Sequence, residues 1–469
     1  MYKKTKIVAT ISDKKCDVTF LKKLHKSGMD VVRLNTAHQG FEEAQKVIDN
    51  VRKVSDKIAI LVDTKGPEVR TTIVDEPIDV KTGDTIVIYG KPDEKTTDLN
   101  HVNVSYSGFV KDLKVGNYIL IDDGSLEMHV IEKKDDCLIC EAQNDGKIES
   151  RKSINVPGAS FKLPSLTKKD IDFIYYAIEQ KIDFIAHSFV RRKEDVLEIQ
   201  KILDKQKSSI KIIAKIENQE GVDNIDEILE YTYGIMVARG DLAIEIPYEK
   251  IPNIQNMLIN KCIAKRKPVI IATQMLHSMI KNPRPTRAEV SDIANAVYSK
   301  ADAIMLSGET AYGAYPLEAV ETMNKVVLET EKTRSDIHEA PTVVLTDERS
   351  AYLTKMAVEA AVALDVKAIV ADSNTGSSIR NMAGFRGRRP IFAFCYDKAI
   401  VRHLSLSYGV FAQYLEQTAN SHEFIRKAIN QLLEEKRIKE NDMVLVFAGN
   451  FGNKFGKSFV EISPVEKLI

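Results

Sequence analysis

The chain has 469 residues, more than one ordinary hydrophobic core needs, so we expect two to four domains. Lys plus Arg and Asp plus Glu each number 67, so no overall charge argues for binding to nucleic acid or to a lipid surface, and any anion site must be local. A hydrophobic share of 44% without a run of 18 apolar residues indicates a folded globular protein and excludes a membrane-spanning helix.

The N-terminus passes from two lysines directly into a short β-like run and lacks the apolar core and cleavage site of a signal peptide. We therefore expect a cytoplasmic protein. Five cysteines, an odd number, do not form a disulfide framework in a chain of this size. Cys137 and Cys140 form an isolated CxxC without a second ligand pair, which favours ordinary strand residues over a metal or redox site.

Apolar, β-branched runs alternate with helix-like segments along most of the chain. There are eight: KIVATI (6–11), VVRLN (31–35), IAILVD (58–63), FIAHSF (184–189), IKIIAKIE (210–217), YGIMVAR (233–239), PVIIATQM (268–275) and ADAIMLS (301–307). Eight strand-helix units of this kind close naturally into a (β/α)8 TIM barrel.

One interval of about 120 residues, after the third run, has a different character. Its segments, such as DTIVIYG and NYILIDDG, alternate at period two and are separated by Gly and Asp turns, which predicts an inserted all-β lid domain. After about residue 335 a separate C-terminal α/β domain is expected. The predicted domains are 1–66 and 162–335 for the barrel, 67–161 for the lid, and 336–469 for the C-terminal domain.

Polar residues gather at the carboxyl ends of the predicted barrel strands, where a barrel carries its active site. They are Arg33, Asn35, Asp63, Ser188, Lys215, Glu217, Arg239, Asp241, Thr273 and Ser307. Any one of these side chains could simply be a solvent-exposed polar residue at the rim of the barrel. That explanation does not readily account for polar residues at the ends of seven different strands. Lys215 and Glu217 stand two positions apart and so share one face of their strand.

Glu217 and Asp241 end consecutive strands and can approach one hard cation, which predicts Mg²⁺, with Mn²⁺ as a substitute. Lys215 and Arg33 add fixed positive charge. This cluster suits a substrate with several negative charges whose reaction creates an enolate or transfers a phosphoryl group. No GxxxxGK[ST] motif is present, so any nucleotide is held in another way.

Over essentially its full length the chain resembles the pyruvate kinase family. The resemblance rests on VVRLN, DTKGPEVR (63–70), IDDG, NVPGA, SFVRR, AKIENQEG, MVARGDLAIEIP, IATQML and PRPTRAEVSDIANAVYSKADAIMLSGETAYGAYPLEAV, in the family's order. It implies transfer of a phosphoryl group from phosphoenolpyruvate to ADP, giving pyruvate and ATP, with Mg²⁺ and in many members K⁺. A homotetramer with a phosphorylated allosteric effector is also implied by the family alone.

Carried over by position, the resemblance implies that Glu217 and Asp241 bind Mg²⁺ and that Lys215 stabilises the phosphoryl group and the enolate. Arg33 would bind the phosphate. The backbone at Gly240 and Asp241, together with Thr273, would hold the carboxylate of phosphoenolpyruvate.

Thr273 and Ser307 are candidates for a water-linked proton path to the enolate carbon. His38, Arg70 and Lys152 would approach the nucleotide, the last two from the lid; simple surface charge remains an alternative for Lys152.

The resemblance implies K⁺ ligands at Asn35, Asp63 and Thr64, but Ala37 stands where the family commonly has a serine ligand. Glu68 matches the members that require K⁺.

In the C-terminal domain a loop between a strand and a helix fits a phosphate-binding effector loop, although a plain capped turn fits as well. Its residues are Ser373, Asn374, Thr375, Gly376, Ser377 and Ser378. The tail NFGNKFGKSF (450–459) lies where relatives have a second effector loop.

Two alternatives stay open from the residues alone. A metal-dependent aldolase could use the same lysine and carboxylates, although the lid and third domain argue against it. A catalytically silent metabolite sensor would retain the effector domain, although intact Lys215, Glu217, Asp241 and Thr273 argue against that. The aldolase would need no ADP, and the sensor would form no product.

Overall fold

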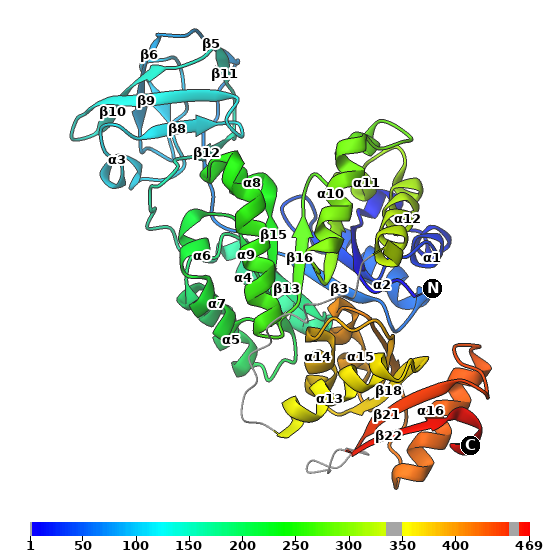
Figure 1. Ribbon diagram of the computed structural model, residues 1–469. Coiled ribbons are helices and arrows are strands. Elements are labelled where there is room, and N and C mark those ends of the chain that lie inside the picture. Colours follow the sequence, from blue (N-terminus) through cyan, green and yellow to red (C-terminus); the bar gives the residue numbers. More distant parts are fainter. Residues whose placement is uncertain (1, 334–348, 450–458) are drawn as a thin grey trace.

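The computed structural model describes residues 2–333, 349–449 and 459–469, which form three parts (Figure 1). A closed barrel with its helices lies in the middle, a small β domain stands off one end, and an α/β domain packs at the other end. This architecture is the one predicted from the sequence. Within these residues, no helix combines the length and the apolar character needed to cross a bilayer.

Eight parallel strands close the barrel in the order β1-β17-β16-β15-β14-β13-β3-β2. They are β1 (Lys6–Thr10), β2 (Val31–Asn35), β3 (Ala59–Asp63), β13 (Phe184–His187), β14 (Lys211–Ile216), β15 (Gly234–Ala238), β16 (Val269–Ala272) and β17 (Ala303–Leu306). Each lies within one of the eight predicted runs. Side chains directed into the barrel and side chains directed at the helices are both buried, which explains why these strands lack a polar face.

Helices cover the outside of the barrel (Figure 1). They are α1 (Val18–Lys26), α2 (Phe41–Val54), α4 (Lys168–Glu179), α5 (Lys193–Lys205), α6 (Gln219–Asp223), α7 (Ile225–Tyr231), α8 (Arg239–Glu245), α9 (Ile251–Ala264), α10 (Arg287–Tyr298), α11 (Gly308–Ala311) and α12 (Pro316–Thr333). Capping boxes open two of them, Thr167 with Asp170 and Thr286 with Glu289. Each box satisfies backbone N–H groups of the first turn and so defines where the helix begins.

The lid lies between β3 and β13, as predicted. Its elements are β4 (Val69–Arg70), β5 (Ile78–Val80), β6 (Thr85–Tyr89), β7 (Val102–Asn103), α3 (Phe109–Asp112), β8 (Tyr118–Ile121), β9 (Leu126–Lys133), β10 (Cys137–Ala142), β11 (Gly146–Ile148) and β12 (Ser153–Asn155). Leu126, Met128 and Val130 of β9 alternate with more exposed neighbours and enter the lid's own core. Cys137 and Cys140 are free thiols buried on β10, as expected for strand residues.

The C-terminal domain has a five-stranded sheet in the order β20-β19-β18-β21-β22 with helices on both faces. Its elements are α13 (Arg349–Ala363), β18 (Ala368–Ser373), α14 (Ser377–Gly384), β19 (Ile391–Cys395), α15 (Lys398–His403), β20 (Val410–Tyr414), α16 (Ser421–Glu434), β21 (Met443–Ala448) and β22 (Phe459–Pro464). The antiparallel β22 was not predicted. The boundary at residue 335 and the tail 450–458 lie outside the described residues.

A buried ion pair joins the C-terminal domain to the amino end of the barrel. Arg386 Nη1 donates to Asp302 Oδ1 at 2.9 Å, and both side chains are almost fully buried. Asp302, which directly precedes β17, also accepts hydrogen bonds from the Tyr408 and Val269 N–H groups. The carboxyl ends of the barrel strands are thus left facing the lid.

Candidate active site

The polar residues predicted at the strand ends come together beneath the lid. Hydrogen bonds and ion pairs join Arg33 of β2, Asp63 of β3, Ser188 after β13 and Lys215 of β14. All four are buried. Buried polar groups of this kind are costly without partners, and here the partners are one another.

Lys215 lies at the centre of this cluster. Its Nζ is 2.7 Å from Ser188 Oγ, 3.0 Å from Glu217 Oε1 and 3.1 Å from Asp63 Oδ1. An ammonium group has three protons, so each can be directed at one of these acceptors. Burial alone would lower the pKa of Lys215, but the Asp63 and Glu217 carboxylates outweigh it and hold that pKa above its ordinary value. Lys215 is therefore a permanent positive charge.

Arg33 is the second cation of the site. Its Nε donates to Asp63 Oδ2 at 2.6 Å, and its Nη1 donates to Thr10 Oγ1 at 3.0 Å. Burial raises the pKa of Asp63, but Arg33 and Lys215 more than reverse this effect and hold it below its ordinary value. The Asp63 carboxylate therefore sets the guanidinium and the ammonium group side by side, an arrangement suited to a ligand with several negative charges.

Glu217 and Asp241 follow the neighbouring strands β14 and β15, and the Phe189 N–H donates to Glu217 Oε2 at 2.7 Å. Burial raises the pKa of both carboxyl groups in spite of the opposing charge of Lys215. Three carboxylates, those of Asp63, Glu217 and Asp241, face two cations. A divalent cation bound by Glu217 and Asp241 would supply the missing positive charge, and carboxylate oxygens are ligands that Mg²⁺ prefers.

Among the described residues, no group of three or more His, Cys, Asp or Glu side chains is arranged to hold a metal ion. Two carboxylates, those of Glu217 and Asp241, would leave most positions of an octahedral Mg²⁺ ion open. Substrate oxygens and water are the groups that usually fill such positions on Mg²⁺.

Thr273 and Gln274 leave β16 with φ angles of 67° and 58°, left-handed backbone that residues other than glycine rarely adopt. Thr273 Oγ1 accepts a hydrogen bond from the Gly240 N–H at 2.8 Å, and Arg239 Nη2 donates to the Thr273 carbonyl at 2.7 Å. These bonds hold the turn against the start of α8, which carries Gly240 and Asp241. The predicted carboxylate-binding groups thus lie together, with the Gly240 N–H directed at Thr273.

Ser307 follows β17, and its N–H donates to Glu309 Oε2 at 2.7 Å. The other oxygen of the buried Glu309 accepts from the Leu276 N–H at 3.1 Å. This carboxylate therefore joins the loop that carries Ser307 to the loop that carries Thr273.

The predicted K⁺ ligands lie on adjacent strands. Asn35 and Asp63 are register partners on β2 and β3, and Thr64 follows Asp63 directly. Asn35 Oδ1 accepts from the Ala37 N–H at 3.2 Å, so Ala37 contributes a backbone contact but has no side-chain oxygen. Three of the expected oxygen-bearing residues are present, and the fourth position is apolar.

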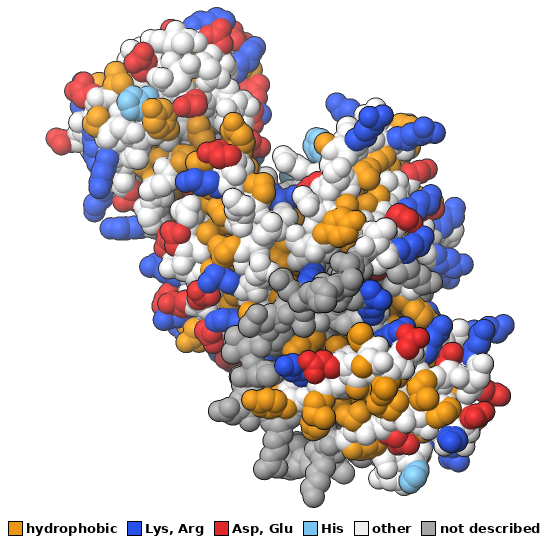
Figure 2. Space-filling view, in the orientation of Figure 1, with side chains coloured by type: hydrophobic (Ala, Val, Ile, Leu, Met, Phe, Trp, Pro, Cys, Tyr) orange, Lys and Arg blue, Asp and Glu red, His pale blue; other side chains and the backbone are white. Residues whose placement is uncertain are grey.

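Arg70 and Lys152 lie on the lid strand β4 and just before β12, which pair with each other. Their salt bridges are to lid residues: Arg70 with Glu68 at 2.6 Å, and Lys152 with Asp122 at 2.9 Å and Glu149 at 3.0 Å. His38 is exposed beyond the end of β2. The molecular surface is hollowed between the lid and the barrel (Figure 2).

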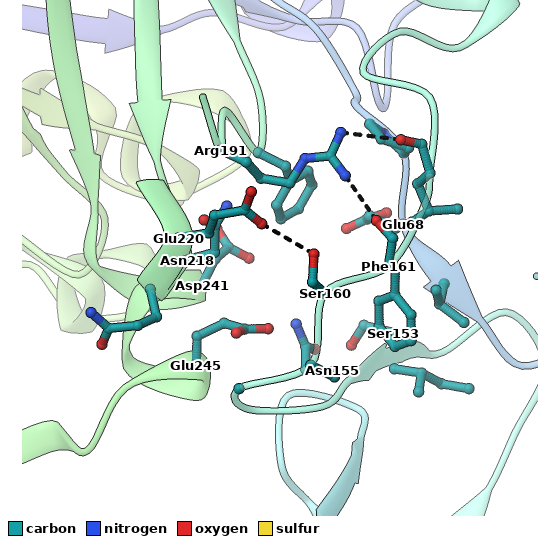
Figure 3. Close-up of a pocket in the computed structure, with 18 of the residues that line it drawn as sticks. Glu68, Ser153, Asn155, Ser160, Phe161, Arg191, Asn218, Glu220, Asp241 and Glu245 are labelled. Carbon is teal, nitrogen blue, oxygen red and sulfur yellow. Dashed lines mark hydrogen bonds between the residues drawn. The ribbon is translucent and has the colours of Figure 1, made fainter. Parts of the chain in front are cut away.

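A cavity of about 360 Å³ lies where the lid meets the barrel. Asp241 and Glu245 line it from the barrel side, and Ser153, Asn155 and Phe161 line it from the lid side (Figure 3). Burial raises the pKa of Glu245 to about 7, although a hydrogen bond with Asn155 acts in the opposite direction and lowers it. The proposed metal ligand Asp241 therefore borders both the lid cavity and the charged cluster.

The predicted effector loop connects β18 to α14 in the C-terminal domain. Gly376 has φ 75° and caps α14, and its N–H donates to Ser373 Oγ at 2.9 Å. Arg380 Nη1 donates to the Thr375 carbonyl at 3.3 Å. The loop is thus a glycine-capped turn with hydroxyl groups and one arginine beside it.

Sequence reasoning missed several contacts in the site. Thr10, at the end of β1, orients Arg33 and also donates to the Leu306 carbonyl at 2.9 Å; its position at a strand end was the available signal. Ser188 was recognised as a strand end but received no role. The Phe189 N–H is a backbone group, which no side-chain pattern could have indicated.

Fold and site together define a (β/α)8-barrel protein whose buried cations and carboxylates suit a substrate with several negative charges. Family models agree: "Pyruvate kinase, barrel domain" matches residues 2–320, and "Pyruvate kinase, alpha/beta domain" matches residues 352–462. A pyruvate kinase of Borreliella burgdorferi is 48% identical over 472 residues, covering 100% of this chain and 98% of the relative. One from Bacillus licheniformis is 43% identical over 477 residues, covering 100% and 81%.

The crystal structure of a pyruvate kinase from Cryptosporidium parvum superposes with a TM-score of 0.93 at 36% identity, covering 99% of this chain and 96% of that one. The chain belongs to the pyruvate kinase family. It converts phosphoenolpyruvate and ADP to pyruvate and ATP, the final step of glycolysis. Members of this family generally use Mg²⁺ and often K⁺.

Proposed function

We propose that Lys215, beside a divalent cation on Glu217 and Asp241, neutralises the charge that moves when the phosphoryl group of phosphoenolpyruvate passes to ADP. The contact of 3.0 Å between Lys215 Nζ and Glu217 Oε1 is the observation that carries this proposal. The bond between phosphorus and the enol oxygen breaks, a terminal phosphate oxygen of ADP forms the new bond, and Lys215 is beside the enolate oxygen that results. Mg²⁺, or Mn²⁺ in its stead, would supply electrostatic stabilisation to the phosphoryl and enol oxygens.

Arg33 binds the phosphoryl group through guanidinium N–H groups that do not donate to Asp63. The N–H groups of Gly240 and Asp241, with the Thr273 hydroxyl, bind the carboxylate. Because that hydroxyl now accepts from the Gly240 N–H at 2.8 Å, substrate binding requires a small exchange of hydrogen bonds there. Thr273 and Ser307 lead a proton through water to the methylene carbon of the enolate, which becomes the methyl group of pyruvate.

ADP binds in the hollow between the lid and the barrel, with His38 on the barrel side. Arg70 and Lys152 bind its phosphates when the lid closes, and in doing so they exchange their ion pairs with Glu68 and Asp122 for contacts with phosphate. The partly exposed positions of both cations support this role, because such pairs contribute little stability and are readily exchanged.

K⁺ binds to Asn35, Asp63 and Thr64, with water in place of the serine hydroxyl that Ala37 lacks. The C-terminal domain binds a phosphorylated effector at residues 373–378 and forms contacts between subunits of a cytoplasmic homotetramer. In the proposed division, the lid comprises residues 67–161, the barrel residues 1–66 and 162–335, and the C-terminal domain residues 336–469.

A coupled assay for pyruvate, run with single omissions, tests the cation and substrate requirements. We expect no product without ADP or Mg²⁺, restoration of activity by Mn²⁺, and a marked loss of rate when Na⁺ replaces K⁺. Full activity in the absence of a divalent cation would refute the metal assignment, and full activity in Na⁺ would refute the K⁺ assignment.

A further inference from the structure

Strand β13 ends in a turn, Ser188–Phe189, that contacts both members of the Lys215–Glu217 pair. Lys215 Nζ donates to Ser188 Oγ at 2.7 Å. Ser188 Oγ in turn lies 2.7 Å from the Thr64 carbonyl and 3.3 Å from Asp63 Oδ1. A hydroxyl has one proton, and the shorter contact directs it to the Thr64 carbonyl, which leaves a lone pair for the ammonium group.

The three acceptors around Lys215 differ in kind. Asp63 also binds Arg33, and Glu217 is a proposed metal ligand, so both carboxylates have competing partners. Ser188 is neutral. It can therefore define the direction of the ammonium group without cancelling the positive charge that the phosphoryl group needs.

Phe189 makes the second contact of the turn through its backbone. Its φ of 55° is left-handed, an unfavourable conformation for an aromatic residue, and it directs the N–H at Glu217 Oε2 at 2.7 Å. A strained turn persists when its surroundings enforce it. Here a Cβ on Gly66, itself at φ 72°, would lie 2.8 Å from both the Phe189 ring and Ser188 Cβ. The turn is thus packed tightly against the chain segment that leads into the lid.

We propose that Ser188 is a positioning residue for phosphoryl transfer, holding the Lys215 ammonium group in the orientation that the reaction uses. The Phe189 N–H holds Glu217 in the same way, so one turn sets the geometry of the whole pair. This inference rests on the proposed role of Lys215, and it adds to the site a hydroxyl group that does not contact substrate.

The test compares Ser188→Ala and Ser188→Cys with the full-length enzyme. Alanine removes the acceptor, and cysteine keeps a group at the γ position that is larger than the hydroxyl and is only a weak acceptor. We expect kcat to fall about 10- to 100-fold in both variants, the loss typical of one hydrogen bond to a charged group. The KM for phosphoenolpyruvate should change by less than about threefold, since the substrate contacts remain. Calorimetric Mg²⁺ affinity should be unchanged.

Thr232→Val is the matched control. Thr232 Oγ1 is buried and lies 2.8 Å from the Ile212 carbonyl and 2.9 Å from the Gly234 carbonyl. Thr232 comes just before the amino end of β15, whereas the site lies at the carboxyl ends of the strands, so its loss removes a buried hydroxyl without touching the site. We expect its kcat to remain at the wild-type value.

Wild-type kcat in the Ser188→Cys variant would overturn the proposal. Equal losses of kcat and of phosphoenolpyruvate affinity would also overturn it, because the hydroxyl would then be a substrate ligand. Lys215→Met separates this inference from the proposed function. If Lys215→Met loses turnover and the Ser188 variants do not, only the positioning role fails; if Lys215→Met retains turnover, the role of Lys215 itself fails.

Discussion

Replacing Lys215 with methionine removes the ammonium charge while keeping an unbranched side chain of similar length. Two unit charges about 4 Å apart interact by about 4 kcal/mol at an effective dielectric constant near 20. Lys215 Nζ is already 3.0 Å from Glu217 and 3.1 Å from Asp63, so a phosphoryl oxygen bound beside them would lie within that range. About 4 kcal/mol corresponds to a loss of about 1,000-fold in kcat.

The substitution leaves Glu217 and Asp241 in place and removes a cation that competes for Glu217. Mg²⁺ affinity, measured by calorimetry, should therefore be equal to that of the wild type or higher. Lys211→Met is a matched control, because Lys211 is the first residue of the same strand and lies at the opposite end of the barrel. A coupled assay should give near-normal kcat for Lys211→Met. A kcat for Lys215→Met within about tenfold of the wild type would refute the electrostatic reasoning.

Three further results are expected. Ala37→Ser adds a hydroxyl two residues after Asn35 and should lower the K⁺ concentration for half-maximal rate several-fold; an unchanged K⁺ titration would show that position 37 does not border the bound ion. Asp302→Asn leaves Arg386 buried without its charge partner and should lower the free energy of unfolding by about 3–5 kcal/mol in urea titrations; a loss below about 1 kcal/mol would show that the pair is dispensable. The raised pKa of Glu245, about 7, means that the folded protein binds its proton more tightly than the unfolded chain does, so this group costs stability as pH rises from about 4.5 to 7. Glu245→Gln should accordingly raise Tm more at pH 8 than at pH 5, and an equal rise at both would contradict the assignment.

The barrel was predictable because parallel strands covered on both faces must be apolar along their whole length, and eight such runs are visible in the sequence. The lid was predictable for the opposite reason. Its strands cover a core on one side only, and residues such as Leu126, Met128 and Val130 therefore alternate with polar ones.

The site was predictable only to the level of side chains at strand ends. The shared face of Lys215 and Glu217 follows from the period of a strand, but the Ser188 hydroxyl reaches Lys215 through a left-handed turn at Phe189. Such a conformation is selected by packing against Gly66, a contact between segments more than 100 residues apart. The residues next to Phe189 in the sequence therefore do not predict this turn.

The strand β22 escaped prediction for a similar reason. Most residues of β22 are only partly buried, so the strand has no strong apolar pattern. It lies at the edge of the sheet, and its antiparallel pairing with β21 depends on tertiary packing instead of local sequence. Likewise, the Asp302–Arg386 pair joins two domains and becomes visible only when they are packed together.

The most direct test of the proposed chemistry is a crystal structure with Mg²⁺ and a non-reactive analogue of phosphoenolpyruvate. We expect one cation with an oxygen of Glu217 and an oxygen of Asp241 each at about 2.1 Å, and Lys215 Nζ at about 2.8 Å from a phosphoryl oxygen. An ammonium group turned away from the analogue, or two carboxylates too far apart to share the ion, would contradict it.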